Sequence, residues 1–210
     1  MQLTGIILNF ILNITCIAAI VIGIIKIKEP SLFLILTVLI LSEIRNVSIL
    51  FGYSSPLLLN LFIFTEFSAY IIYLGFMINK NQFIALITTS LLSLAFFLID
   101  INPNYETFNI RSFFLIIIPP LLIILGCFLY LKNILLADDN SNFYNLPSFW
   151  IVLGFLNLFL IKVLCEASSF ILFNNELLYR KLSGNIIQTF YIIFYLFSIK
   201  AFLCSKRNYR

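Results

Sequence analysis

The sequence predicts an all-α, polytopic membrane protein with seven transmembrane helices. Of its 210 residues, 62% are hydrophobic and only 10% are charged, whereas an ordinary soluble domain is about half apolar and about a quarter charged. The apolar residues form seven runs, each close to the roughly 20 residues that a helix needs to cross a bilayer. Because so few charged side chains cannot cover a water-facing exterior, we expect lipid to be the main solvent of this chain.

The seven expected helices follow one another through nearly the whole chain. They cover residues 3–25, 31–51, 57–78, 83–101, 110–131, 147–173 and 184–203. Segments rich in Asn, Pro, Gly, Ser and Asp separate them, as is typical of turns, and the longest connection covers residues 132–146. We therefore expect one transmembrane domain over residues 1–210, with no room between the helices for a separate water-soluble domain. The first run has no positively charged leader and is expected to be kept as a helix.

The positions of Lys and Arg predict the orientation, because cytoplasmic loops carry an excess of these residues. One side collects Lys26, Lys28, Lys80, Lys132, Lys206, Arg207 and Arg210, and the other collects Arg111, Arg180 and Lys181. The N-terminus is therefore expected outside and the C-terminus in the cytoplasm, across a bacterial inner membrane. Aromatic residues that favour membrane interfaces fall near predicted span ends: Trp150, Tyr53, Tyr105, Tyr130 and Tyr179.

The composition excludes several classes of function. The chain has no histidine, and zinc hydrolases, Ser–His or Cys–His nucleophile systems and histidine proton relays all need an imidazole. The four cysteines, Cys16, Cys127, Cys165 and Cys204, lie singly in apolar runs, so we interpret them as small buried hydrophobic residues. The basic residues lie at helix ends rather than in one patch. No metal, no cofactor and no nucleic-acid partner is expected.

Five ionisable side chains fall inside predicted spans, where each costs at least a few kcal/mol and usually faces the bundle interior. They are Glu43 and Arg45 in the second helix, Glu66 in the third, and Lys162 and Glu166 in the sixth. Lys162 and Glu166 are four residues apart on one helix face, close enough to pair. Glu43 shares a face with Asn46, whereas Arg45 is expected to point elsewhere, either outward or to a partner on another helix.

A rise of about 1.5 Å per residue places these side chains at similar heights in the outer half of the membrane, together with Asn13 and Gln188. The third helix adds a stripe of Glu66, Tyr70 and Tyr73, and the seventh adds Gln188, Tyr191 and Tyr195. The resulting prediction is a ligand pocket lined by Glu43, Asn46, Glu66, Tyr70, Tyr73, Lys162, Glu166, Gln188 and Tyr191. The alternative is a set of interhelical hydrogen bonds that only hold the bundle together.

Pro119 and Pro120 lie in the middle of the fifth predicted helix, where they remove two backbone donors and are expected to kink or break it. A broken helix is also a feature of transporters, but no matching break occurs in a second repeat. A retinal protein is excluded because Lys200, the only lysine of the last span, lies near its cytoplasmic end. The adjacent glutamates and histidines of prenyl-protein proteases and the Pro-Gln motif of seven-helix sugar transporters are also missing.

Several short motifs resemble a group of short, uncharacterised seven-helix integral membrane proteins of Bacteroidota that are often encoded beside sensor histidine kinases or response regulators. The resemblance rests on Ser42-Glu43, on Phe64-Thr65-Glu66-Phe67 followed by tyrosines, and on Pro147-Ser148-Phe149-Trp150-Ile151 followed by Gly154. Where such proteins often carry Tyr-Phe after this glycine, this chain reads Phe155-Leu156-Asn157. The resemblance implies a membrane component linked to signalling, and it implies no particular activity.

Four functions remain open on these observations. The first is a non-enzymatic receptor or accessory subunit that binds a small or lipidic ligand in the polar layer and acts on a sensor kinase or another membrane complex. The second is an intramembrane enzyme that modifies lipids with Glu43 and Glu66 as an acid/base pair. The third is a carrier for a small solute or ion. The fourth is a structural subunit of an envelope complex, whose charged residues would contact neighbouring chains.

Overall fold

The computed structural model describes residues 2–27, 29–50, 56–78, 84, 110–136, 143–171 and 176–204, and within them every regular element is a helix. The elements are α1 (Gln2–Lys26), α2 (Pro30–Leu50), α3 (Pro56–Met77), α5 (Ile110–Leu136), the short 3₁₀ helix η1 (Phe143–Asn145), α6 (Pro147–Ile171) and α7 (Glu176–Cys204). Apart from residue 84, the helix expected over residues 83–101 lies outside the described residues. The all-α prediction is confirmed, and the number of seven spans stays a prediction.

The helix ends differ from the predicted spans mainly in α5 and α7. The first three helices begin and end within one residue of the expected bounds, whereas α5 continues to Leu136 and α7 begins at Glu176 rather than at residue 184. With 29 residues, α7 is about 43 Å long, and the apolar core of a bilayer is about 30 Å thick. Hydropathy marks the apolar part of a helix, but a helix also continues through charged turns such as the one that contains Arg180.

Five of the described helices contain segments long and apolar enough to cross a membrane: Thr4–Lys26, Pro30–Ser48, Ile117–Leu136, Pro147–Ser168 and Leu182–Cys204. Large apolar side chains on these helices point away from the bundle, among them Phe10 at 66%, Leu135 at 75% and Phe128 at 53% exposure. In water such a surface would be strongly unfavourable. The apolar helices and their apolar exterior are those of a multi-pass integral membrane protein.

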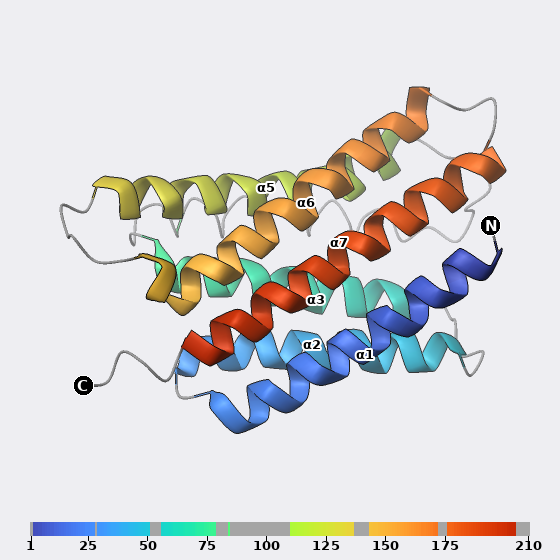
Figure 1. Ribbon diagram of the computed structural model, residues 1–210. Helices are drawn as coiled ribbons and strands as arrows, with labels where there is room; N and C mark the ends of the chain where they lie inside the picture. Colours follow the sequence, from blue (N-terminus) through green and yellow to red (C-terminus); the bar gives the residue numbers. More distant parts are fainter. Residues whose placement is uncertain are drawn as a thin grey trace.

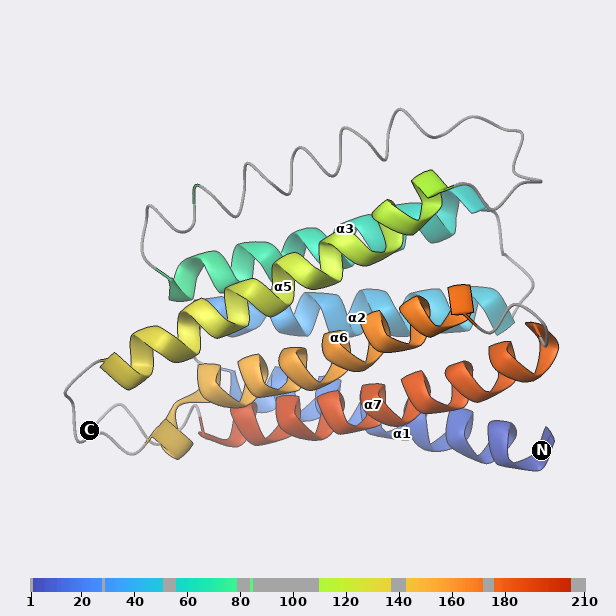
Figure 2. The same cartoon turned by 90° about the horizontal axis from the view of Figure 1, so that it is seen from above.

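The helices form a bundle in which the described members make a closed ring of neighbours (Figure 1). Along the ring, α1 packs against α2, α2 against α3, α3 against α5, α5 against α6, α6 against α7, and α7 against α1. Figure 2 shows the same helices from above, with α1 and α7 side by side. The start of α1 and the end of α7 lie at opposite ends of the bundle, which we call the N-terminal end and the C-terminal end.

Aromatic side chains fill the centre of this ring. The ring of Tyr70 in α3 lies 4.6 Å from that of Phe155 in α6, and Phe155 lies 5.5 Å from Phe194 in α7, measured between ring centroids. All three side chains are at most 1% exposed. Offset and edge-to-face aromatic pairs add about 0.5–1.5 kcal/mol beyond the burial of their area. This aromatic core therefore ties α3, α6 and α7 together.

Two glycines allow close helix contacts on either side of α7. A Cβ atom on Gly154 of α6 would lie 2.9 Å from the Phe194 ring, and one on Gly23 of α1 would lie 3.1 Å from the Phe202 ring. Small residues of this kind are common where membrane helices approach each other closely, because packing drives their association.

The two prolines of α5 do not break the helix, which runs from Ile110 to Leu136 through Pro119 and Pro120. Membrane helices tolerate proline because their neighbours and small local adjustments satisfy the freed backbone groups. The break foreseen as one outcome from the sequence is therefore not present in the described chain.

Aromatic residues also gather at the C-terminal end of the bundle, as the sequence predicts for Trp150. Its indole Nε1 donates a hydrogen bond to the Tyr144 carbonyl at 2.9 Å, and Lys200 Nζ lies 5.7 Å from its ring centroid. Tyr130 is 5% exposed and its hydroxyl bonds Ser148 Oγ at 2.6 Å, which joins the end of α5 to the start of α6. Tyr53 and Tyr105 lie outside the described residues.

Candidate functional site

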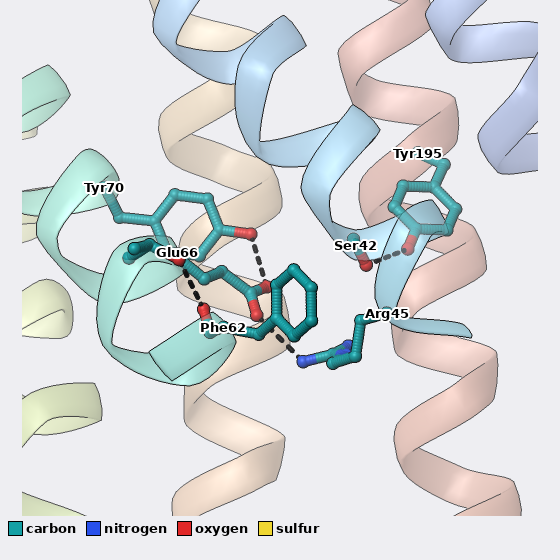
Figure 3. A network of polar contacts seen from close by, with 7 residues as sticks. Ser42, Arg45, Phe62, Glu66, Tyr70 and Tyr195 are labelled. Atoms are coloured by element: carbon teal, nitrogen blue, oxygen red, sulfur yellow. Dashed lines mark hydrogen bonds and ion pairs between the residues drawn. The ribbon is translucent and has the colours of Figure 1, made fainter. Parts of the chain in front are cut away.

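The polar layer is centred on an ion pair between α2 and α3. Arg45 Nη1 lies 3.1 Å from Glu66 Oε2, and the Tyr70 hydroxyl donates a hydrogen bond to Glu66 Oε1 at 2.8 Å (Figure 3). The Arg45 and Glu66 side chains are 17% and 10% exposed. Both carboxylate oxygens of Glu66 are therefore occupied, one by a cation and one by a hydroxyl.

Local helix geometry explains why Glu66 and Tyr70 meet. The two residues are four apart in α3, so their side chains lie one above the other on a single face. Arg45 must come from a different helix, and its guanidinium suits this role because it is always charged and can donate several hydrogen bonds in a fixed plane. The pair neutralises two charges that would each be costly in lipid.

The layer continues from α2 to α7. Ser42, one turn before Arg45, has its hydroxyl 3.3 Å from the Tyr195 hydroxyl, as Figure 3 shows. Tyr191 and Tyr195 lie near Arg45, and the two tyrosine rings lie 6.2 Å apart. Ser42 and Arg45 therefore direct their polar groups to α7 and to α3 respectively.

Helix α1 completes the layer through Cys16, which is fully buried. Its thiol donates a long hydrogen bond to the Leu39 carbonyl of α2, with 3.7 Å between sulfur and oxygen. The same side chain interacts with Glu43 and with Tyr195. Buried cysteine was expected from the sequence for this position, but its place beside a carboxylate was not.

Four buried polar atoms of the described residues have no hydrogen-bond partner. They are Asn13 Oδ1, Glu43 Oε2, Gln188 Oε1 and the Tyr73 hydroxyl oxygen. A buried polar group without a partner costs about 1–3 kcal/mol, and most buried polar groups in proteins are satisfied. Three of these atoms are side-chain oxygens of α1, α2 and α7.

One of the predicted pocket residues, Tyr73, lies in another part of the bundle's interior. Tyr73 is fully buried, with its ring 5.9 Å from that of Phe155. Its hydroxyl lies near Tyr130 and Glu29 rather than near the Arg45–Glu66 pair, and it has no hydrogen-bond partner among the described residues. Asn46 is half-buried in α2.

The predicted pair in α6 lies beside α3. Lys162 Nζ sits 5.1 Å from the centroid of the Phe67 ring, a distance at which a cation is attracted to the face of an aromatic ring. The Lys162 charge also acts on the carboxylate of Glu166, as the four-residue spacing predicts. Phe67 in turn contacts Phe159 of α6, with 5.7 Å between ring centroids.

The sequence predicts neither Ser42 nor Cys16 as a site residue. It places Tyr195 in the polar stripe of the last helix and gives Arg45 a partner on another helix as one of two outcomes, but neither residue is included in the list of predicted pocket residues. One signal was available for Arg45, because it follows Ser42 by three residues and shares its helix face. Which neighbouring helix this face meets is decided by tertiary packing. No sequence signal distinguishes Cys16 from the other cysteines in apolar runs.

The described residues contain no group of three His, Cys, Asp or Glu side chains that could hold a metal ion. The site instead combines one ion pair, several hydroxyls and three side-chain oxygens that remain free to accept hydrogen bonds. Such a set can bind a ligand that brings positive charge or hydrogen-bond donors.

Comparisons with known proteins place no family beside these observations. No protein-family model, no curated protein and no solved structure matches the chain.

Proposed function

We propose that this chain is a non-enzymatic membrane receptor or accessory subunit that binds a small or lipidic ligand in the polar layer. In this proposal the layer lies in the outer half of a bacterial inner membrane, and the bound ligand alters a sensor kinase or another complex in the same membrane. The likeness to short Bacteroidota membrane proteins encoded beside such kinases supports the link to signalling.

The observation that carries the proposal is the set of free oxygens on Asn13, Glu43 and Gln188. Polar residues that only hold helices together bond one another, as Arg45, Glu66 and Tyr70 do. A ligand that supplies hydrogen-bond donors to such buried, unpartnered oxygens binds with a favourable free energy, because it removes the cost of leaving them unsatisfied. The pattern therefore favours ligand binding over a purely structural role.

In this proposal, the ligand acts on the partner by changing how the helices of the layer pack together. The layer joins α1, α2, α3 and α7 through side-chain contacts. A ligand that binds one packing of these helices better than another shifts the population between them. Lys26, Lys132 and Lys200 belong to the C-terminal end of the bundle, which is where we place the contact with the partner.

Catalysis by paired glutamates has less support. Glu66 already bonds a guanidinium and a tyrosine hydroxyl, so neither of its oxygens is free to take a proton from a substrate. The carrier alternative has less support too, because α5 is continuous through its prolines and offers no broken helix at the layer.

Ligand retention tests the proposal. The intact protein is extracted from its native membrane and examined by native mass spectrometry, where we expect a bound small molecule or lipid. Replacing Gln188→Leu keeps the size of the side chain but removes the free oxygen, so occupancy should fall. The matched control is Thr189→Val, because Thr189 is exposed on the same helix and bonds only the Asn185 carbonyl. An empty wild-type protein, or equal occupancy in both variants, would contradict ligand binding.

A second measurement tests the partner. Signalling by a kinase that co-purifies with the chain should change when the chain is deleted and should be restored by wild-type protein but not by Gln188→Leu. Recovery of no partner, together with unchanged signalling after deletion, would rule out the signalling part of the proposal.

A further inference from the structure

Glu43 is the carboxylate of the polar layer that lacks a countercharge. Arg45 neutralises Glu66, and the Lys162 charge acts on Glu166. Within the part of the chain that the structure describes, Glu43 forms no ion pair, and its Oε2 atom is buried without a hydrogen-bond partner. Glu43 itself is half-buried, and a carboxylate with a buried, unpartnered oxygen is unfavourable in a medium of low dielectric constant. A positive charge at this oxygen would lower the free energy of the folded protein.

A second free oxygen lies on the same level of the bundle. The contact of the Cys16 thiol with the Leu39 carbonyl shows which levels of α1 and α2 lie side by side. Asn13 precedes Cys16 by three residues and Glu43 follows Leu39 by four, and the two helices run in opposite directions. Both steps lead about one helical turn toward the N-terminal end, so Asn13 and Glu43 face each other across the α1–α2 contact.

Further amide side chains lie between the N-terminal end of the bundle and the level of Glu43. Asn185 of α7 lies opposite Gly5 of α1, where a Cβ on the glycine would be 3.7 Å from Asn185 Oδ1. Gln188 follows Asn185 by three residues on the same side of α7, and its Oε1 is free. Amide side chains are therefore spaced along the α1–α7 contact between the end of the bundle and Glu43.

We propose that Glu43 and Asn13 form a binding site for a monovalent cation, either an alkali-metal ion or a protonated amine. This inference rests on the proposed function and names the chemistry of its ligand. Carboxylate and carbonyl oxygens are the ligands of hard cations, and an ammonium group donates to the same oxygens. One positive charge cancels the charge of Glu43, whereas a divalent ion would leave an excess charge, and the described residues offer no three-ligand metal cluster for it.

The cation should stabilise the folded protein, because a ligand that binds only the folded state raises its stability by mass action. Purified protein in detergent is unfolded thermally in chloride salts at constant ionic strength, with N-methylglucamine as the reference cation that is too large for the site. We expect the midpoint temperature to rise with sodium or with methylammonium concentration and to saturate. Saturation by sodium alone indicates a metal ion, and saturation by methylammonium alone indicates an amine.

The variant Glu43→Gln is nearly the same size and carries no charge. It should weaken the apparent cation affinity by roughly tenfold or more, the loss expected for one charge-assisted contact. In the reference salt, the midpoint temperature of Glu43→Gln should equal or exceed that of wild type. A saturating cation should raise the midpoint temperature of wild type relative to that of Glu43→Gln. Asn13→Leu, which removes the second oxygen, gives an independent reading if Glu43→Gln does not fold. Glu29→Gln is the control, because it removes a carboxylate that lies before α2, outside the spans, and its cation response should equal that of wild type.

The two failures can be told apart. A wild-type protein without any cation response, or a response that Glu43→Gln and Asn13→Leu both retain, overturns the cation site, as would a protonated Glu43 that needs no counterion. A ligand that Gln188→Leu releases in the mass-spectrometric test would then still support the receptor. Conversely, a Glu43-dependent cation response in a chain that recovers no partner and whose deletion leaves signalling unchanged would keep the cation site and overturn the link to signalling.

Discussion

Arg45 and Glu66 show how a charged pair behaves inside a membrane bundle. Each alone would be costly to bury, and together they also satisfy a tyrosine hydroxyl. The net gain from such a pair over apolar residues is small, but removing one partner leaves the other charge buried and unpaired. The pair is therefore more important for the choice of helix neighbours than for total stability.

Replacing Glu66→Leu should destabilise the protein by about 3 kcal/mol, because Arg45 loses its countercharge. The double variant Arg45→Leu with Glu66→Leu should recover much of this loss. Tyr70→Phe removes only the hydroxyl, so a cost of about 1 kcal/mol is expected. Unfolding by denaturant in detergent for the full double-mutant cycle measures the coupling. A double variant whose loss in free energy of unfolding equals the sum of the losses of the two single variants would contradict the coupling between Arg45 and Glu66.

Glu29, which lies between α1 and α2, predicts a dependence of stability on pH. Burial raises the pKa of Glu29 above its usual value of 4.5, so the folded state disfavours the ionised form. The stability that protonated Glu29 provides should be present at low pH and lost as pH rises through the raised pKa. The midpoint temperature of wild type should therefore fall relative to that of Glu29→Gln as the pH rises from about 4 to about 7.

Thermal unfolding of both proteins across this pH range measures the gap. A midpoint temperature of wild type that rises relative to that of Glu29→Gln as the pH rises would contradict the prediction. It would mean that the start of α2 stabilises the carboxylate more than burial penalises it, since negative charge is favourable at a helix N-terminus.

At the scale of elements, contacts between helices depend on a few small residues. Gly154 lets α6 approach Phe194 and Phe197 of α7. Phe194 is stacked on Phe155 and only 1% exposed, so it has little freedom to move away from an added methyl group.

Gly154→Ala should therefore destabilise the protein by about 1–3 kcal/mol, the usual cost of overpacking a tight interface. Gly184 is the matched control, because a Cβ there meets nothing within 4 Å. Gly184→Ala should be neutral or should stabilise α7 by up to about 1 kcal/mol, since alanine favours helix more than glycine does. Midpoint temperatures in detergent compare the two, and equal losses at both sites would contradict the packing argument.

At the scale of the whole molecule, the orientation across the membrane follows from charge. Lys26, Lys132 and Lys200 belong to the same end of the bundle, and the prediction from the positive-inside rule places this end in the cytoplasm. A reporter enzyme that is active only in the cytoplasm should be active when fused after residue 210. The same reporter fused before residue 1 should be inactive. The reverse result would invert the predicted orientation.

The sequence predicted much of the fold and less of the site. The bounds of α1, α2 and α3 were predicted within one residue, because turn residues interrupt apolar runs there. The start of α7 was not, because its first turns are polar and carry no hydropathy signal. Glu66 and Tyr70 were placed on one face by their spacing, whereas the link from Arg45 to Glu66 depends on which helix lies beside α2. The ligand pocket and the number of seven spans stay predictions.

The order of the amino acids is enough to predict that this chain is helical, that its helices are long and apolar enough for a membrane, and which side chains are costly in lipid. These properties depend on composition and local spacing, and both are fixed along the chain. The pairings of Arg45 with Glu66 and of Ser42 with Tyr195 depend on the tertiary structure. So does the position of Glu43 beside Cys16, where no residue of the described chain forms an ion pair with it. The pairing of buried polar groups depends on helix neighbours and on the register between them, and the packing of the aromatic and glycine contacts sets both.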